Sequence, residues 1–203
     1  MKNYDTISEK DGHDIVKTAR VIVTEYLKNG IKIKLKKEFM DNFSFKSGLF
    51  VTLNNNQELR GCIGYPLPDK LLFNALEDAA ISAATKDPRF EPVKYNELNS
   101  ITFEVTILTS PKRIIVNKPE EYLSQIKVGR DGLIVKHNHF SGLLLPQVPI
   151  EYGWNEEEFL EYTCEKAGLP KNHWKNLETE IQKFEGIVFK EEKPNGIVIK
   201  EAL

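Results

Sequence analysis

Two segments of this 203-residue sequence share one order of hydrophobic patterns, and this recurrence constrains the fold more than any other feature. In each segment two short strand patterns flank a turn, and a helix pattern and a third strand pattern follow. The first segment spans residues 48–108 and the second spans 132–192, so corresponding patterns lie 84 residues apart. We interpret the recurrence as an internal β-β-α-β duplication.

The first segment has the clearer patterns. Residues 49–53 and 59–65 are rich in strand formers, and the polar run between them is typical of a hairpin turn. Apolar residues at helical spacing predict a helix over 71–83. The strict alternation at 101–107 predicts a third strand. The second segment repeats this order, with a last strand predicted at 186–189.

A further amphipathic helix is predicted over residues 8–29, where Ser8 can cap its start and Gly30 can end it. We expect this helix to pack on the two repeats. The sequence thus predicts one domain over residues 1–203, of the α+β class. Two lobes with antiparallel sheets and flanking helices would arise from the duplication, and a cleft would form where their strand-to-helix corners face each other.

Composition narrows the range of functions. A formal net charge of −2 disfavours binding to nucleic acids, and no apolar run reaches the ~18 residues of a membrane span. The polar N-terminal residues lack the apolar core of a signal peptide, and two cysteines, Cys62 and Cys164, do not form a disulfide framework. We therefore expect a cytoplasmic protein. The densest cationic run, residues 32–37, is typical of a solvated strand or loop edge.

The strand pattern at 59–65 carries the strongest candidate site, with the sequence Leu-Arg-Gly-Cys-Ile-Gly-Tyr. Arg60 and Cys62 are two residues apart, so a regular strand would present both side chains on one face. A guanidinium there would lower the pKa of the thiol and could also bind an anion. Gly61 and Gly64 would let a ligand or another backbone approach closely. The structural alternative is a buried Cys62, an Arg60 paired with an acid, and glycines that permit a bulge.

Four further residues could complete this site. Glu104 lies on the polar face of an alternating strand, where it is either simply exposed or faces the cleft, paired with Arg60 or Arg89 or acting as a general base. Arg89 follows the helix at 71–83 and would return toward the 59–65 strand. Gln147 and Glu151 flank the corresponding corner of the second repeat and would add polar groups to the cleft.

No metal and no cofactor are predicted. His137 and His139 lie near a turn and could begin a metal site, but no third ligand has suitable spacing. The two cysteines also lack the C-x-x-C spacing of zinc sites.

The segment 59–64 resembles the signature hexapeptide of the AMMECR1 family. Further segments resemble later blocks of that family, namely 87–90, 103–105, 132–135, 142–148, 151–154 and 163–169. The resemblance implies an α+β fold of two lobes and a pathway link to Memo-like and radical-SAM proteins. It assigns no reaction.

Two functional hypotheses remain open. The first is an enzyme that uses Cys62 as a nucleophile, Glu104 to move a proton, and Arg60 and Arg89 to hold an anionic small molecule or modified protein. The second is a binding or regulatory module that recognises an acidic or phosphate-bearing partner through Arg60 and Arg89 without turnover.

Overall fold

The computed structural model describes residues 2–201. The chain divides into two compact units, which we describe separately. Unit 1 comprises the residues up to Leu108 together with the segment that begins at Ile187, and unit 2 comprises Thr109–Gly186. The helices and strands confirm the predicted α+β class. No helix among the described residues has the length and apolar character needed to cross a membrane.

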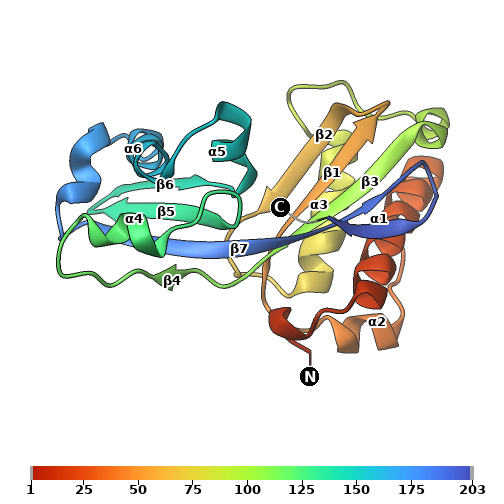
Figure 1. The fold of residues 1–203 in the computed structure, drawn as a ribbon. Helices are drawn as coiled ribbons and strands as arrows, with labels where there is room; N and C mark the ends of the chain where they lie inside the picture. The colour runs from red at the N-terminus through yellow and green to blue at the C-terminus, as the bar shows by residue number, and fades with distance from the viewer. Residues whose placement is uncertain (1, 202–203) are drawn as a thin grey trace. The chain divides into compact units, whose positions relative to one another are not determined.

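Unit 1 is a sheet with helices on one face (Figure 1). Its helical elements are η1 (Tyr4–Thr6), α1 (Glu9–Asn29), α2 (Lys37–Asn42), α3 (Leu72–Thr85) and η2 (Tyr95–Asn99). Its strands are β1 (Gly48–Asn55), β2 (Glu58–Tyr65), β3 (Ile101–Leu108), the second half of β7 (Glu180–Glu191) and β8 (Val198–Glu201). The strand order is β2-β1-β3-β7, and β8 also pairs with β7.

The helix α1 begins and ends as its sequence predicts. The Ser8 hydroxyl accepts a hydrogen bond from the Asp11 amide, and the Asp11 carboxylate accepts one from the Ser8 amide. This reciprocal pair satisfies two amides that a helix start leaves without partners. Gly30 ends the helix with a φ of 72°, a left-handed conformation that glycine adopts without strain.

The helices α1 and α3 cover the apolar face of the unit 1 sheet. Leu49, Val51 and Leu53 of β1 are fully buried among residues of both helices, as is Phe103 of β3. Since successive side chains of a strand alternate between faces, Thr52 and Glu104 point to the face opposite these helices. That second face carries the candidate site.

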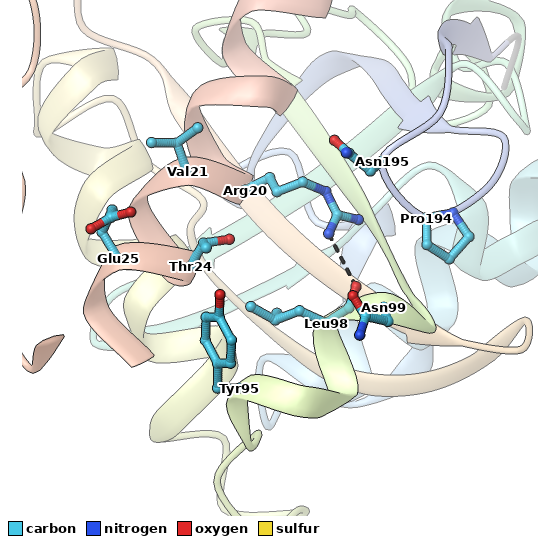
Figure 2. A pocket seen from close by; sticks show the side chains of 9 residues that line it. All are labelled: Arg20, Val21, Thr24, Glu25, Tyr95, Leu98, Asn99, Pro194 and Asn195. Carbon is cyan, nitrogen blue, oxygen red and sulfur yellow. Dashed lines mark hydrogen bonds between the residues drawn. The ribbon is translucent and has the colours of Figure 1, made fainter. Parts of the chain in front are cut away.

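A buried ion pair joins α1 to β7. The Arg20 guanidinium donates to both oxygens of Glu191, with a distance of 2.8 Å from Nε to Oε1, and to the carbonyl oxygen of Ile101. It also donates to the carbonyl oxygen of Leu98 (Figure 2). The side chain of Glu191 is completely buried, and it also accepts a hydrogen bond from the Phe103 amide. A surface pocket of about 370 Å³ lies beside Arg20.

Unit 2 is a smaller α+β unit with its own core. Its strands are β4 (Lys112–Arg113), β5 (Asp131–His137), β6 (Phe140–Leu144) and the first half of β7, in the order β6-β5-β7-β4. Its helical elements are α4 (Glu121–Gln125), α5 (Gln147–Tyr152), α6 (Glu156–Lys166) and η3 (Lys171–Lys175). Phe159, Leu160 and Trp174 pack on the buried face of β5 and β7.

Both units have the same pairing order among the two strands of the hairpin and the long strand that follows it. In unit 1 the first strand of the hairpin pairs with β2 and β3, and in unit 2 the first strand of the hairpin pairs with β6 and β7, all antiparallel. This order agrees with the predicted duplication, which itself stays a prediction. The sequence did not predict the helix α5. It also did not predict the length of β7, which begins six residues before the predicted strand.

Candidate functional site

The Cys62 thiol lies in a row of side chains that crosses three paired strands. Cys62 of β2 is opposite Thr52 of β1, and Thr52 is also opposite Glu104 of β3. Residues directly opposite in antiparallel strands project from the same face, so the three side chains are neighbours on the face away from α1 and α3. The Thr52 hydroxyl donates a hydrogen bond to the Cys62 sulfur at 3.3 Å. All three residues are half-buried.

Burial raises the pKa of the Cys62 thiol above its ordinary value. The hydrogen bond from Thr52 and the charge of Arg89 act to lower this pKa, but the negative charges of Glu104 and Asp87 act with burial to raise it. The expectation of a thiolate stabilised by a neighbouring guanidinium is therefore wrong in direction. The reason is that the thiol is desolvated while two carboxylates lie near it.

The Glu104 carboxylate has no ion-pair partner in the described part of the chain. Within residues 2–201 it forms no ion pair, so neither Arg60 nor Arg89 is its partner. Burial is the main cause that raises the pKa of Glu104, followed by the negative charge of Glu201, while Lys190 acts to lower it. A carboxyl group with a raised pKa is better suited to exchange protons near neutral pH than an ordinary glutamate.

Arg60 does not accompany Cys62. Its guanidinium donates to both carboxylate oxygens of Glu97, at 3.0 and 3.2 Å, and to the carbonyl oxygen of Glu91 at 2.8 Å. These contacts lower the pKa of Glu97. Arg60 and Cys62 do not share a face of the strand as predicted, because the pairing of β1 with β2 shifts register here. Leu53 pairs with Gly61 and Asn54 with Leu59, so Arg60 is the extra residue of a β-bulge.

The basic residue that reaches Cys62 is Arg89. Its guanidinium binds the Asp87 carboxylate through Nε and Nη2, at 3.0 and 2.7 Å, and Nη2 also lies 3.4 Å from the Cys62 carbonyl oxygen. Asp87 in turn accepts the Cys62 amide at 2.8 Å. Since β2 ends the strand order, this pair binds backbone groups that an edge strand would otherwise leave open.

Half of the Arg89 side chain is exposed, and its Nη1 makes no hydrogen bond within the described part of the chain. Nη1 is thus free to bind an anionic group beside Cys62. The Asp87 side chain, by contrast, is buried, and the hydrogen bonds from Arg89 hold its pKa well below the ordinary range.

We expect Asp87→Asn to lower the free energy of unfolding by about 2 kcal/mol at pH 7, because it removes charge-assisted hydrogen bonds to buried groups. A carboxylate with a lowered pKa stabilises the fold fully above the unfolded-state pKa near 4 and loses that contribution as the pH falls. The difference between the wild type and the variant should therefore shrink from pH 7 to pH 3, as measured by urea unfolding. An equal difference at both pH values would contradict this, and the exposed Asp41→Asn is the control.

Gly61 and Gly64 are explained by neighbouring protein atoms. A Cβ at Gly61 would lie 2.2 Å from the carbonyl oxygen of Ala83 in α3, and a Cβ at Gly64 would lie 2.3 Å from that of Leu49 and 2.5 Å from the Phe50 ring. Of the two expected uses of these glycines, close approach of another backbone accounts for Gly61. Gly61 thus allows α3 to pack on the strand that carries Cys62, and Gly64 leaves room for Leu49 and Phe50 of β1.

Gln147 and Glu151 lie on α5 of unit 2, whereas the other candidate residues belong to unit 1. Glu151 is exposed, and the buried Oε1 of Gln147 has no hydrogen-bond partner among the described residues. That these two residues join the Cys62 site stays a prediction.

Sequence reasoning missed two participants, Thr52 and Asp87. Thr52 could have been predicted, because pairing the two strands of the predicted hairpin residue by residue shows which residues lie opposite Cys62. Asp87 stood within the segment 87–90, but no local pattern indicates that its carboxylate reaches back to the amide of Cys62.

Comparisons with known proteins agree with this description. A family model named AMMECR1 matches residues 16–189. Protein MJ0810 of Methanocaldococcus jannaschii is 50% identical over 196 residues, which is 96% of each chain. Protein PF1979 of Pyrococcus furiosus is 48% identical over 202 residues, covering 97% of this chain and 96% of that one.

A solved structure has the same fold. The crystal structure of the uncharacterized protein PH0010 from Pyrococcus horikoshii matches with a TM-score of 0.86 and 46% sequence identity, covering 97% of this chain and 99% of that chain. The family match spans most of the chain, including the row of Cys62, Thr52 and Glu104. The chain therefore belongs to the AMMECR1 family.

Proposed function

We propose that the protein is an enzyme in which the Cys62 sulfur attacks an electrophilic carbon of an anionic small molecule or of a modified protein. The observation that carries this proposal is the row of Cys62, Thr52 and Glu104 across three paired strands. Nucleophilic catalysis by cysteine requires a thiol and a base, and in this row the Thr52 hydroxyl contacts the thiol while Glu104 offers a carboxylate that forms no ion pair within residues 2–201.

Glu104 is the proton acceptor in this proposal. Because the pKa of Cys62 is raised, the thiolate is scarce at neutral pH, and the thiol proton has to leave as the sulfur attacks. Thr52 lies opposite both residues and in this structure donates its hydroxyl proton to the Cys62 sulfur. In the proposed step this hydroxyl turns, passes its own proton to Glu104 and takes the proton of Cys62. The S–H bond breaks, the bond from sulfur to carbon forms, and the electron pair of the leaving group departs with that group.

Arg89 supplies the contact for an anionic substrate. Its exposed Nη1 is free within residues 2–201, while Asp87 fixes the rest of the guanidinium next to the Cys62 backbone. A fixed guanidinium binds carboxylate or phosphate oxygens at little entropic cost.

Both cysteines are free thiols, which favours a reducing compartment, and we therefore place this function in the cytoplasm.

A binding module without turnover is the second candidate. The raised pKa of Cys62 favours it, because a protonated thiol is a weak nucleophile. In this case Arg89 alone would hold the acidic or phosphate-bearing partner, since Arg60 is already paired with Glu97.

Alkylation by a matched pair of reagents tests both candidates without a known substrate. Iodoacetate is anionic and iodoacetamide is neutral, and both place a carboxymethyl or carbamoylmethyl group on sulfur with loss of iodide. We expect the rate for iodoacetate, divided by the rate for iodoacetamide, to fall about threefold at Cys62 in Arg89→Gln, because the variant loses one partly screened charge contact. Arg113→Gln, at an exposed position of unit 2, should leave the ratio unchanged.

The pH profile separates the enzyme from the binding module. If Glu104 accepts the thiol proton, the iodoacetamide rate should rise in two steps, one as Glu104 ionises and one above the ordinary range of a thiol. Glu104→Gln should remove only the first step. A single step in the wild type would contradict the enzyme proposal. Failure to label Cys62 in the folded protein, with the fully buried Cys164 as internal reference, would contradict the enzyme proposal and leave the binding module, which depends on Arg89.

A further inference from the structure

An extended segment of unit 1 lies outside every sheet. Residues 31–36 connect α1 to α2 without helical or strand hydrogen bonding (Figure 1). Within the described part of the chain, the backbone amides and carbonyls of residues 31–35 form no hydrogen bond, and the carbonyl of Lys36 accepts only the Met40 amide. The segment therefore presents backbone groups in the way that an unpaired edge strand does.

The side chains of this segment alternate as those of a strand do. Ile33 and Leu35 are half-buried against the core of unit 1, whereas Lys32, Lys34 and Lys36 are exposed. Apolar side chains inward and basic side chains outward are the alternation of a half-buried strand, so a partner strand could pair here with its apolar side chains on the same side as Ile33 and Leu35.

A groove of about 540 Å³ runs beside the segment. Its walls come from α1, α2 and residues 33–36, and its apolar residues are Val21, Ile33, Leu35, Phe39 and Phe43. This apolar floor next to unpaired backbone resembles the surfaces to which extended peptides bind by strand addition.

The lysines at the groove differ in whether they have an ion-pair partner. Lys34 and Lys36 form no ion pair within residues 2–201, whereas Lys17 on α1 is bound to Glu191. Two acids, Asp14 and Glu38, also line the groove. The unpaired cations thus lie along the extended segment, and a ligand lying parallel to that segment would place its own charges opposite them.

We propose that this groove binds an extended peptide segment of a partner protein in which acidic and apolar residues alternate. The peptide would pair with the backbone of residues 31–35, place its apolar side chains over Ile33 and Leu35, and place its carboxylates near Lys34 and Lys36. This site is separate from the Cys62 site, and its failure would leave the proposed function untouched.

The same charges argue against a second copy of this chain as the occupant. Antiparallel pairing of two such segments would place lysines opposite lysines, and like charges directly opposite in paired strands are destabilising. Acidic side chains on the partner strand convert this repulsion into attraction.

The test uses a dye-labelled octapeptide that alternates glutamate and valine, and a control octapeptide that alternates lysine and valine. Fluorescence anisotropy should show binding of the acidic peptide only, and the affinity should fall as salt is raised from 50 to about 300 mM. The double variant Lys34→Glu, Lys36→Glu should bind the acidic peptide at least about tenfold more weakly, the effect of two lost charge contacts. Lys10→Glu, at another exposed lysine, should bind as the wild type does.

Amide hydrogen exchange locates the binding. The acidic peptide should slow exchange within residues 31–35 and leave exchange in β2 unchanged. Equal binding of both peptides, unchanged exchange at 31–35, or binding that survives the double charge reversal would each overturn the proposal. So would sedimentation of the free protein as a dimer that the double variant abolishes, because the segment would then be an interface between two copies.

Discussion

Replacing Glu191 by glutamine is expected to lower the free energy of unfolding by about 3–5 kcal/mol, because it leaves the Arg20 guanidinium buried without a counter-charge. Arg20 is 8% exposed and Glu191 is 3% exposed, so water cannot replace the lost partner. Glutamine keeps the size of the side chain, and the loss therefore measures charge and hydrogen bonding rather than a cavity. Urea unfolding of the wild type and the variant at pH 7 measures this difference in the free energy of unfolding.

The double variant Arg20→Met, Glu191→Met provides the matched control. It removes both charges and replaces them with apolar side chains, so we expect it to be more stable than Glu191→Gln. Lys17→Met should change stability by less than about 1 kcal/mol, because Lys17 is partly exposed. A loss below about 1 kcal/mol for Glu191→Gln would mean that the buried pair contributes little to the fold.

Gly61→Ala is the second substitution with a large expected effect, a loss of about 3 kcal/mol. The added Cβ would lie 2.2 Å from the carbonyl oxygen of Ala83, and this oxygen belongs to the backbone of α3 and cannot rotate away. Either α3 or β2 must shift. Since Cys62 follows directly, the alkylation rate of its thiol should change together with the urea midpoint.

Glu58→Ala serves as the control for Gly61→Ala, because Glu58 is an exposed residue of the same strand. It should alter stability by no more than about 0.5 kcal/mol. If Gly61→Ala were as stable as this control, the close packing of α3 on β2 would not hold in solution.

The strands of unit 1 were predictable because their patterns are local. The alternation at 101–107 specifies both the strand and the face that Glu104 occupies, and the structure has β3 at Ile101–Leu108. The hairpin followed from two strand patterns around a polar turn, and β1 and β2 pair as predicted. Local periodicity therefore determined which residues share a face wherever the strand is regular.

The bulge at Arg60 is where that reasoning failed. Counting two residues from Arg60 to Cys62 assumes regular alternation, and one extra residue in β2 breaks it. The sequence indicated a bulge only as the structural alternative that the glycines of this strand permit, and Gly61 directly follows the extra residue. The structural alternative named for Arg60, pairing with an acid, is what the structure has, with Glu97 as the partner.

The electrostatics of Cys62 could not be derived from its neighbours in sequence. Its pKa depends on burial and on Asp87, Arg89 and Glu104, which come from two other segments of the chain. The prediction that Arg89 returns toward this strand was correct, because a helix followed by a tight turn brings the chain back along its own sheet. No sequence pattern indicates that Asp87 already pairs with Arg89.

The ion pair of Arg20 and Glu191 joins residues 171 positions apart, and this separation affects the order of events during synthesis. Arg20 leaves the ribosome long before Glu191, so the nascent α1 has no carboxylate for its inward-facing cation while the intervening chain is being made. The sheet of unit 1 also lacks its β7 and β8 strands until then. Unit 2, being one contiguous segment, can fold cotranslationally before the sheet of unit 1 closes.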